Sequence, residues 1–277
     1  MPAVSILILT LNEEINLADC LDSCAWCDDI VVFDSNSTDK TLDIAQARGA
    51  RIYTRTFDNY AAQRNAALHD VSYRHPWVLM LDADERVPKD LVDEINRVIA
   101  NVADGDAMFL MRRKDFFFGK WLRRSSGYPT WFGRLVRPTR VHVEREINEE
   151  YVADGGVGRL AAHLEHHPFN KGITWWFERH NRYSSMEASS LAKERTRPVE
   201  WRGCLTADPL RRRRTLKQVA YRLPGRPILV FCYLYILRLG LLDGLPGLRY
   251  CLMRMCYEFM IDLKSREIDA RAAGAPV

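Results

Sequence analysis

The first 105 residues alternate short apolar segments with segments whose apolar residues recur every three or four positions. Residues 4–10 are nearly all apolar and rich in β-formers, as expected for a strand buried on both faces of a parallel sheet, and strands are also predicted over residues 29–34, 51–54 and 77–81. Helical spacing follows each of them, in residues 15–21, 41–47, 61–68 and 91–99, and we expect Asn12 to cap the first helix. Repeated strand–helix units predict an α/β fold with a mainly parallel sheet and helices on both faces.

Polar clusters follow three of the predicted strands at their C-terminal ends. They are Thr10/Asn12/Glu13, Asp34 with Ser35 and Asn36, and Asp82/Asp84. Ligands bind outside the C-terminal strand ends of such sheets, so these clusters locate the expected site. The glycine motifs of dinucleotide-binding and P-loop proteins are absent after the first strand, which argues against both classes.

Two carboxylates, Asp82 and Asp84, directly follow the fourth predicted strand. Hard oxygen ligands suit Mg²⁺ or Mn²⁺, and such a cation can bridge to a diphosphate. The alternative is that both are ordinary surface acids. Arg64, on the third predicted helix, can meet a phosphate with its planar guanidinium, or it can be a solvated arginine on the helix face.

The front half resembles a family 2 glycosyltransferase with the GT-A fold. Four segments carry the resemblance in the family's order and spacing: residues 6–14, 31–39, 63–67 and 81–85. The resemblance implies a nucleotide-sugar site at the strand ends. By that resemblance the pocket is lined by Thr10, Asn12 and Glu13, with Asp34 on the base, Arg64 near the base or phosphates, Asp82 by the ribose and metal, and Asp84 on the metal.

Residues 145–183 are similar to the subgroup that adds β-linked glucose to the lipopolysaccharide inner core. This resemblance assigns the general base to Glu149, with Glu146 second because several glutamates crowd the segment. An inverting transfer requires one carboxylate as base and one cation at the departing diphosphate. His166 would help to hold the diphosphate or metal by resemblance only; the alternative is a plain strand followed by a turn at Pro168.

The chain has 277 residues, 47% of them hydrophobic, and a net charge of +4 that conceals an asymmetry. Residues 1–150 carry 19 basic and 24 acidic residues, whereas residues 151–277 carry 21 and 12, a difference that suggests two roles. Seven cysteines, an odd number, fit a reduced cytosolic compartment, and the start of the chain lacks a signal-peptide pattern. Cys24 and Cys27 have redox or zinc spacing, but without a second pair we expect them to line the core.

The rear half contains a predicted helix over 174–193, a basic stretch with Arg211–Arg214, an apolar run over 227–237 and a helix over 248–263. The apolar run is too short to span a bilayer but suits an interfacial or re-entrant helix. With the adjacent arginines it favours association with an anionic membrane surface. The alternative is a soluble helical subdomain that packs on itself or on a dimer mate. A nucleic-acid partner is not expected, because no binding signature accompanies the arginines.

We therefore expect a catalytic domain over 1–170, with a nucleotide-sugar half to about 105 and an acceptor half over 106–170. The aromatic and basic stretch 116–132 would stack on sugars and pair with acceptor phosphates, or form a β-ribbon packed on the core. A helical membrane-associating region over 171–264 and a loose tail over 265–277 follow.

The expected function is a metal-dependent inverting transfer of a hexose. The hexose is glucose from UDP-glucose, and the acceptor is a lipid-anchored glycan such as lipopolysaccharide core, at the cytoplasmic face of the inner membrane. The alternatives are exopolysaccharide or O-antigen assembly on a polyprenyl diphosphate, a non-catalytic sugar-nucleotide-binding scaffold, and a nucleotidyltransferase. The oligomeric state stays open.

Overall fold

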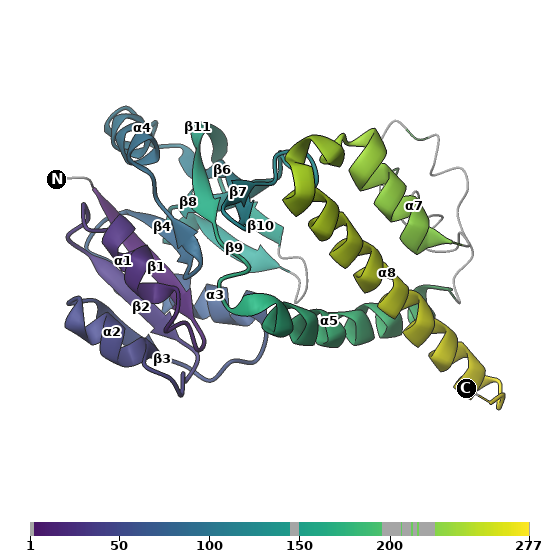
Figure 1. The fold of residues 1–277 in the computed structure, drawn as a ribbon. Coiled ribbons are helices and arrows are strands. Elements are labelled where there is room, and N and C mark those ends of the chain that lie inside the picture. Colours follow the sequence, from purple (N-terminus) through teal and green to yellow (C-terminus); the bar gives the residue numbers. More distant parts are fainter. Residues whose placement is uncertain are drawn as a thin grey trace. The chain divides into compact units, whose positions relative to one another are not determined.

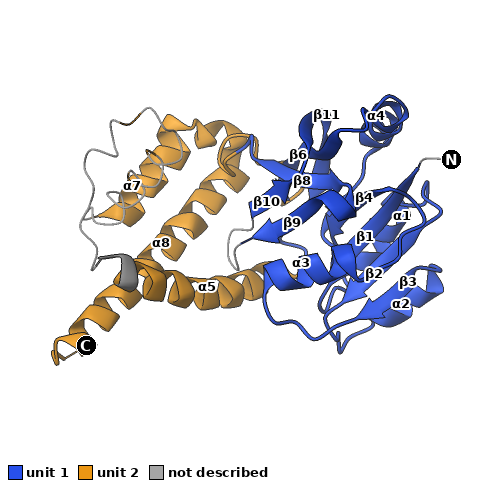
Figure 2. Cartoon of the chain, turned by 180° about the vertical axis from the view of Figure 1, so that it is seen from behind, with its two compact units in different colours: residues 1–116, 128–170 blue, residues 117–127, 171–277 orange. Residues whose placement is uncertain are grey.

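The computed structural model describes residues 3–144, 150–195, 206, 212, 215 and 225–276. Two compact units divide the chain (Figure 2): Met1–Phe116 with Tyr128–Asn170, and Phe117–Gly127 with Lys171–Val277. The segment 117–127, which the sequence assigned to the first domain, therefore clusters with the second unit.

The first unit contains one large mixed sheet in the order β3-β2-β1-β4-β8-β6-β11-β5 (Figure 1). Its strands are β1 (Val4–Thr10), β2 (Ile30–Asp34), β3 (Arg51–Thr54), β4 (Trp77–Asp82), β5 (Glu85–Arg86), β6 (Asp106–Phe117), β8 (Trp131–Val136) and β11 (Gly156–His166). Strands β3, β2, β1 and β4 pair in parallel, as do β6 and β11. Strand β8 is antiparallel to both neighbours, and β5 is antiparallel to β11. The predicted α/β fold with a mainly parallel sheet is confirmed.

Alternate strand residues face opposite sides of the sheet and build two cores. On one side Ile6 and Ile8 pack with Leu17 and Leu91; on the other, Leu7 belongs to a cluster that includes α3 and β9. The covering elements are α1 (Leu17–Ser23), α2 (Thr41–Ala47), α3 (Tyr60–His69), α4 (Lys89–Ala100), the short 3-10 turn η1 (Pro138–Arg140) and a hairpin of β9 (Val141–Glu144) and β10 (Glu150–Ala153). Helices thus cover both faces, as expected.

Helix α1 begins at Leu17, so the prediction that Asn12 caps it is wrong. Asn12 has a left-handed φ of 54°, which differs from the extended conformation usual at an N-cap. Its amide donates to Ser37 Oγ at 2.8 Å, and the Glu13 amide donates to Thr41 Oγ1 at 2.7 Å. Because Ser37 in the loop after β2 and Thr41 at the start of α2 accept from these amides, the helix starts later.

The cysteines near α1 line the core, as predicted. Cys20, Cys24 and Cys27 are buried and unpaired. Burial raises the pKa of the Cys27 thiol to about 11, so this thiol is protonated at neutral pH.

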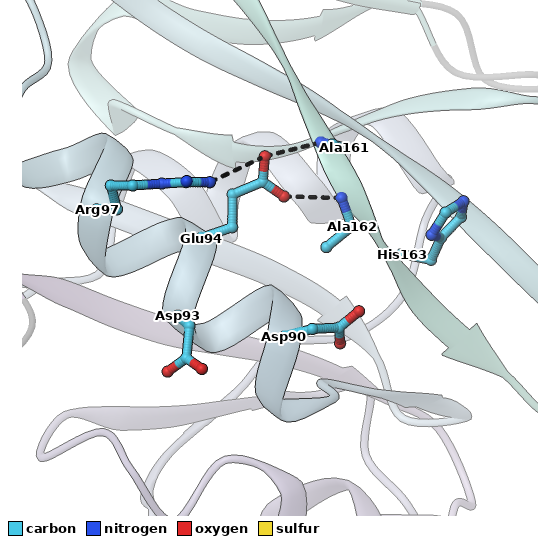
Figure 3. A pocket seen from close by; sticks show the side chains of 7 residues that line it. All are labelled: Asp90, Asp93, Glu94, Arg97, Ala161, Ala162 and His163. Carbon is cyan, nitrogen blue, oxygen red and sulfur yellow. Dashed lines mark hydrogen bonds and ion pairs between the residues drawn. The ribbon is translucent and has the colours of Figure 1, made fainter.

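Helix α4 fastens a distorted part of β11 (Figure 3). The pairing of β11 with β6 shifts register between Arg159 and His163. There the Glu94 carboxylate accepts from the amides of Ala161 at 2.9 Å and Ala162 at 2.7 Å, beside a pocket that also contains His163. Glu94 therefore accepts hydrogen bonds from two backbone amides at the register shift, and these bonds stabilise the strand that ends in His166.

The second unit is helical, with α5 (Gly172–Arg195) and α7 (Arg226–Cys232) packed on α8 (Gly244–Ala272) (Figure 1). A π-helical turn η3 (Tyr233–Leu237) and a 3-10 turn η4 (Gly240–Asp243) join α7 to α8, and the short strand β7 (Lys120–Trp121) also belongs to this unit. Buried side chains include Trp176, Ala188, Leu191, Cys251, Tyr257 and Ile261.

The loose tail predicted from residue 265 is wrong as far as Ala272, because α8 continues to that residue. Two ion pairs at i,i+4 spacing support the extension, Arg266 with Asp262 at 2.9 Å and Arg271 with Glu267 at 2.7 Å. Ser265 is also fully buried, so this turn of the helix has a packing partner.

Among the described residues, no single helix is long and apolar enough to cross a membrane. The segments Arg226–Leu237 and Gly240–Ala272 reach that length and apolarity only when taken together, and the chain bends by 71° between them. Of the predicted basic run Arg211–Arg214, only Arg212 is described, and its side chain is exposed; the rest lies outside the described residues.

Candidate active site

The loops after β1 and β2 meet around Asp34. Thr10 Oγ1 donates to Asp34 Oδ1 at 2.6 Å, and Ser37 donates from its amide at 2.7 Å and its hydroxyl at 2.6 Å. Thr10 and Asp34 are both buried. In this arrangement Asp34 supports the loop, and contact with a base, which stays a prediction, would require an exchange of these bonds.

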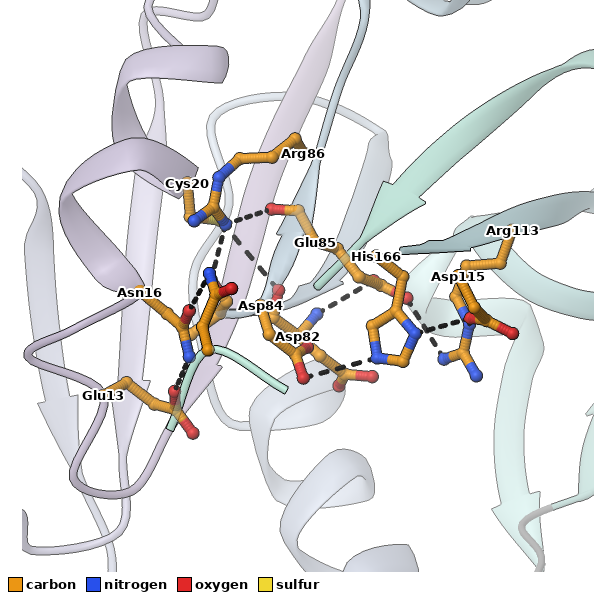
Figure 4. Close-up of polar contacts among 12 residues, drawn as sticks. Glu13, Asn16, Cys20, Asp82, Asp84, Glu85, Arg86, Arg113, Asp115 and His166 are labelled. Carbon is orange, nitrogen blue, oxygen red and sulfur yellow. Dashed lines mark hydrogen bonds and ion pairs between the residues drawn. The ribbon is translucent and has the colours of Figure 1, made fainter. Parts of the chain in front are cut away.

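Asn12 and Glu13 lie in the loop above this pair and tie it to other segments. Asn12 is exposed, and its Oδ1 accepts from the Thr38 amide at 2.8 Å. Glu13 Oε2 accepts from Asn16 Nδ2 at 2.9 Å, and Asn16 Oδ1 accepts from Asn170 Nδ2 at the same distance (Figure 4). This chain of bonds connects the first loop with the residues that follow β11.

Asp82, at the end of β4, lies between two arginines. Arg64 Nη2 donates to Oδ1 at 2.9 Å, and Arg134 Nη2 donates to Oδ2 at 2.5 Å. Burial favours a higher pKa for Asp82, but the positive charges, that of Arg134 foremost, hold the pKa well below its usual range. Arg64 is only 6% exposed, which contradicts the alternative of a solvated arginine.

Arg134, on β8, is a site residue that the sequence reasoning missed. It is 3% exposed and also donates to Glu85 Oε1 at 2.7 Å, while Glu85 Oε2 accepts from the Asp82 amide at 3.0 Å. Arg134 therefore fixes the carboxylate at the end of β4 and the one at the start of β5. The sequence did contain a signal for Arg134, which is the one charged residue in the segment 131–136. An arginine within a buried strand requires an anionic partner, and this could have pointed to the nearby carboxylates.

Asp84 pairs with His166, which ends β11 (Figure 4). Asp84 Oδ2 lies 3.3 Å from His166 Nε2, and the opposite ring nitrogen, Nδ1, lies 2.6 Å from Asp115 Oδ1. Burial alone would lower the pKa of His166, but the charge of Asp84 together with the hydrogen bonds to Asp115 and Asp84 raises the pKa to about 9. The structure thus brings His166 into the site, beside the carboxylate predicted to hold the metal.

The spacing of the Asp84–His166 pair fits a divalent cation that takes the place of the proton on His166 Nε2, because only a neutral imidazole ligates a metal. Adjacent ligands of an octahedral ion held at about 2.1 Å stand about 3 Å apart, close to the 3.3 Å between these two atoms. Among the described residues no group of three or more His, Cys, Asp or Glu side chains could hold a metal, so further ligands would come from substrate and water. Both Asp82 oxygens already accept from arginines, so Asp82 fits this role less well.

The predicted bases Glu149 and Glu146 lie outside the described residues, between β9 and β10. The described start of that hairpin is held by Asn65 on α3, one residue after Arg64. Asn65 Nδ2 donates to the Val143 carbonyl and Asn65 Oδ1 accepts from the Val143 amide, both at 2.8 Å. The strand that leads to these glutamates is therefore fixed beside the helix that carries Arg64.

Aromatic residues of the stretch 116–132 pack under arginines. The Arg112 and Arg159 guanidinium groups lie 4.9 and 5.0 Å from the Trp131 ring centre, and that of Arg113 lies 4.2 Å from the Phe132 ring centre. Arg113 also lies 3.4 Å from Glu85 Oε1. Stacking of these rings on sugars stays a prediction.

Comparisons with known proteins match this architecture to one family. Residues 5–166 match the family model described as glycosyl transferase family 2. The chain is 28% identical over 204 residues to the lipopolysaccharide core biosynthesis glycosyltransferase LpsC of Rhizobium meliloti, covering 70% of this chain and 74% of that protein. It is 35% identical over 204 residues to an uncharacterized glycosyltransferase of Rickettsia conorii, covering 69% and 71%.

Among solved structures, glucosyl-3-phosphoglycerate synthase from Mycobacterium tuberculosis, in complex with Mn²⁺, UDP-glucose and phosphoglyceric acid, is 20% identical. That comparison has a TM-score of 0.36 and covers 49% of this chain and 56% of the solved one. The family model covers more than half of the sequence and includes Thr10, Asp34, Arg64, Asp82 and Asp84. The chain is a family 2 glycosyltransferase.

Proposed function

We propose that this glycosyltransferase is a metal-dependent inverting enzyme that transfers glucose from UDP-glucose to a lipid-anchored bacterial glycan such as the lipopolysaccharide inner core. The observation that carries the proposal is the Asp84–His166 pair beside the arginine-bound Asp82 at the end of β4. The name of the Rhizobium relative supports the acceptor class. Transfer to a polyprenyl diphosphate carrier in exopolysaccharide or O-antigen assembly is the alternative.

In this proposal Thr10, Asn12 and Glu13 border the nucleotide pocket, with Arg64 and Asp82 toward the ribose and phosphates. Asp84 and His166 would hold Mg²⁺ or Mn²⁺, which when bound supplies positive charge at the departing diphosphate. Since that charge favours departure, a protein acid is not required there.

Glu149 is the proposed base, with Glu146 second. It accepts the proton of the acceptor hydroxyl as that oxygen attacks the anomeric carbon and the bond to the diphosphate breaks. The anchoring of β9 by Asn65, next to Arg64, supports a position near the donor.

We place the reaction at the cytoplasmic face of the inner membrane, where a lipid-anchored acceptor is accessible. The support is the basic rear half, with 21 basic and 12 acidic residues over 151–277. A soluble helical subdomain stays the alternative.

The deciding experiment is a thermal-shift and hydrolysis screen of UDP, GDP and dTDP sugars with Mn²⁺, Mg²⁺ or EDTA. We expect UDP-glucose to stabilise the protein only with a cation and to release UDP slowly. Asp84→Ala should lose this metal-dependent shift and at least a hundredfold in turnover, whereas Asp90→Ala, an exposed carboxylate on α4, should change neither. Release of pyrophosphate from UTP and glucose 1-phosphate, in place of UDP from UDP-glucose, would indicate a nucleotidyltransferase, and a thermal shift with no release of UDP would favour the sugar-nucleotide-binding scaffold.

A further inference from the structure

The turn between α7 and α8 exposes large apolar side chains. Leu237 is 75% exposed and Leu242 is 59% exposed, and three more leucines of this turn, Leu239, Leu241 and Leu245, are over two-fifths exposed. We call this region, residues 236–249 together with residues 117–127, the apolar corner. Several strongly exposed leucines in one short segment are unusual for a surface that faces only water.

The corner includes a second segment that is remote in sequence. The Phe118 ring is 62% exposed, and the Arg249 guanidinium of α8 lies 5.1 Å from its centre. Phe118 and the leucines of the turn thus belong to one part of the helical unit, which Figure 2 shows in orange. Their separation in sequence hid this grouping from the sequence analysis.

Buried polar bonds hold the corner in this form. Asp243 is 4% exposed and accepts from the Arg124 amide at 2.9 Å, and from the Ser125 amide and hydroxyl at 2.8 Å. Leu239 has a left-handed φ of 59°, a conformation that costs energy for a branched side chain. The polar group of the turn is therefore directed inward while leucines are directed outward, the reverse of an ordinary surface loop.

The charges of the corner are nearly all positive. Lys120, Arg123, Arg124 and Arg249 are exposed, and the buried Asp243 is the single acidic residue within 117–127 and 236–249, all of which are described. Anionic lipid headgroups attract such cations, and the acyl boundary accepts the apolar side chains. A second copy docked by the same surface would bring like charges together, so a bilayer is the better partner.

We propose that the apolar corner inserts into the headgroup–acyl boundary of an anionic leaflet, with Phe118 and the leucines as the buried groups and the surrounding cations on lipid phosphates. This inference rests on the proposed function only for the expectation of a lipid-anchored acceptor, and vesicle binding tests it without donor or acceptor.

The first test is flotation of the full chain with vesicles of phosphatidylethanolamine and phosphatidylglycerol. The double variant Phe118→Ser/Leu242→Ser should lose at least tenfold in partitioning. The matched control is Phe259→Ser/Leu263→Ser, which removes a phenylalanine and a leucine of similar exposure further along α8, and it should retain partitioning within twofold. Equal loss in both pairs, or loss in neither, would overturn the proposal.

A second pair of variants leaves the apolar side chains intact and so avoids a folding defect. Lys120→Gln/Arg249→Gln should weaken binding several-fold at low salt and much less at high salt, because salt screens the headgroup attraction. The control Arg266→Gln/Arg271→Gln removes two cations from the far end of α8 and should have little effect. The same loss in the control would show that net charge alone, and not the corner, binds the vesicle.

Two further readouts separate the possible failures. Release of UDP from UDP-glucose should persist in the corner variants, since the corner contains none of the proposed donor residues. A chain that binds vesicles through the corner but hydrolyses no nucleotide sugar would support this inference and contradict the proposed function. A lipid-free dimer that Phe118→Ser/Leu242→Ser dissociates in sedimentation equilibrium would instead identify the corner as a self-association surface and overturn the inference.

Discussion

Arg134 is buried and contacts two carboxylates, Asp82 at the end of β4 and Glu85 at the start of β5. Taking such a cation away leaves the buried Glu85 and the part-buried Asp82 with fewer partners, which is costlier than losing a surface ion pair. Arg134 is therefore best understood as a positioning residue, since it would act on the proposed donor site through Asp82.

Arg134→Met should lower the free energy of unfolding by about 3–5 kcal/mol, measured by urea denaturation. Arg134→Lys keeps the charge but not the planar guanidinium, so we expect smaller destabilisation and a raised KM for UDP-glucose with a lesser change in kcat. The exposed Arg266→Met serves as the control. An Arg134→Met protein that unfolds at the wild-type urea concentration would contradict this role.

Glu149→Gln should retain donor binding but lose transfer, because the amide cannot accept the acceptor proton. Thermal shift with UDP-glucose and Mn²⁺ measures the binding, and product formation measures the transfer. Glu146→Gln is the comparison and should retain most activity. If Glu149→Gln turns over normally and Glu146→Gln does not, the base is Glu146.

His180, on α5, stacks on Trp176 with ring centres 3.6 Å apart, and its Nδ1 donates to the Trp176 carbonyl at 2.8 Å. Burial lowers the pKa of His180 from 6.5 to about 4. The unfolded chain therefore binds this proton more readily, so stability falls as pH decreases from 6.5 toward 4, by roughly 1–2 kcal/mol at pH 5.

Thermal unfolding at pH 7 and pH 5 checks this expectation. His180→Phe should show a smaller fall in Tm than the wild type, while His142→Phe, at an exposed position, should show the same fall as the wild type. An unchanged pH dependence in His180→Phe would refute the assignment.

At the level of elements, periodicity predicted the strands β1 to β4. The polar residues at the C-terminal ends of these strands led to the prediction that Thr10, Asp34, Asp82 and Asp84 belong to the site. Regular elements are encoded locally, so one sequence is sufficient to find them. The start of α1 was missed because the amides of Asn12 and Glu13 bond to side chains about 25 residues away. Long-range bonds of this kind leave no local pattern.

The turn into α8 also depends on close backbone packing. A Cβ on Gly247 would lie 2.5 Å from the Gly240 carbonyl oxygen, which is backbone and cannot move aside easily. Gly247→Ala should therefore lower the Tm by several degrees and weaken vesicle binding. Gly105→Ala, where a Cβ meets nothing within 4 Å, should leave both unchanged. Wild-type Tm and vesicle binding in Gly247→Ala would show that the turn tolerates a side chain.

At the level of the whole molecule, the chain passes between the two units three times, after Phe116, Gly127 and Asn170. The sequence analysis placed the boundary between the catalytic domain and the helical region after residue 170, ahead of the helix predicted over 174–193. It could not assign residues 117–127 to the helical unit, since that placement depends on Asp243, more than 110 residues away. A single boundary after residue 170 therefore separates residues 117–127 from the rest of their unit.

A chain truncated after Asn170 keeps residues 117–127 but loses Asp243, the acceptor for the Arg124 and Ser125 amides. We expect trypsin to cleave after Lys120, Arg123 and Arg124 at least tenfold faster in this fragment than in the full chain, measured by mass spectrometry over time. Cleavage after Arg97 on α4 provides the internal reference. Equal rates at Arg124 in both proteins would show that Asp243 does not hold the segment.

The two arginines on Asp82 also bear on how substrates enter. Because Arg64 and Arg134 are paired with the protein's own carboxylate, much of their charge is already balanced before a diphosphate arrives. Under the proposed function, the additional positive charge would arrive with the cation at Asp84 and His166. Donor and cation would then each raise the affinity of the protein for the other by the same factor. Either one alone would bind weakly, and the two would bind together because their charges balance.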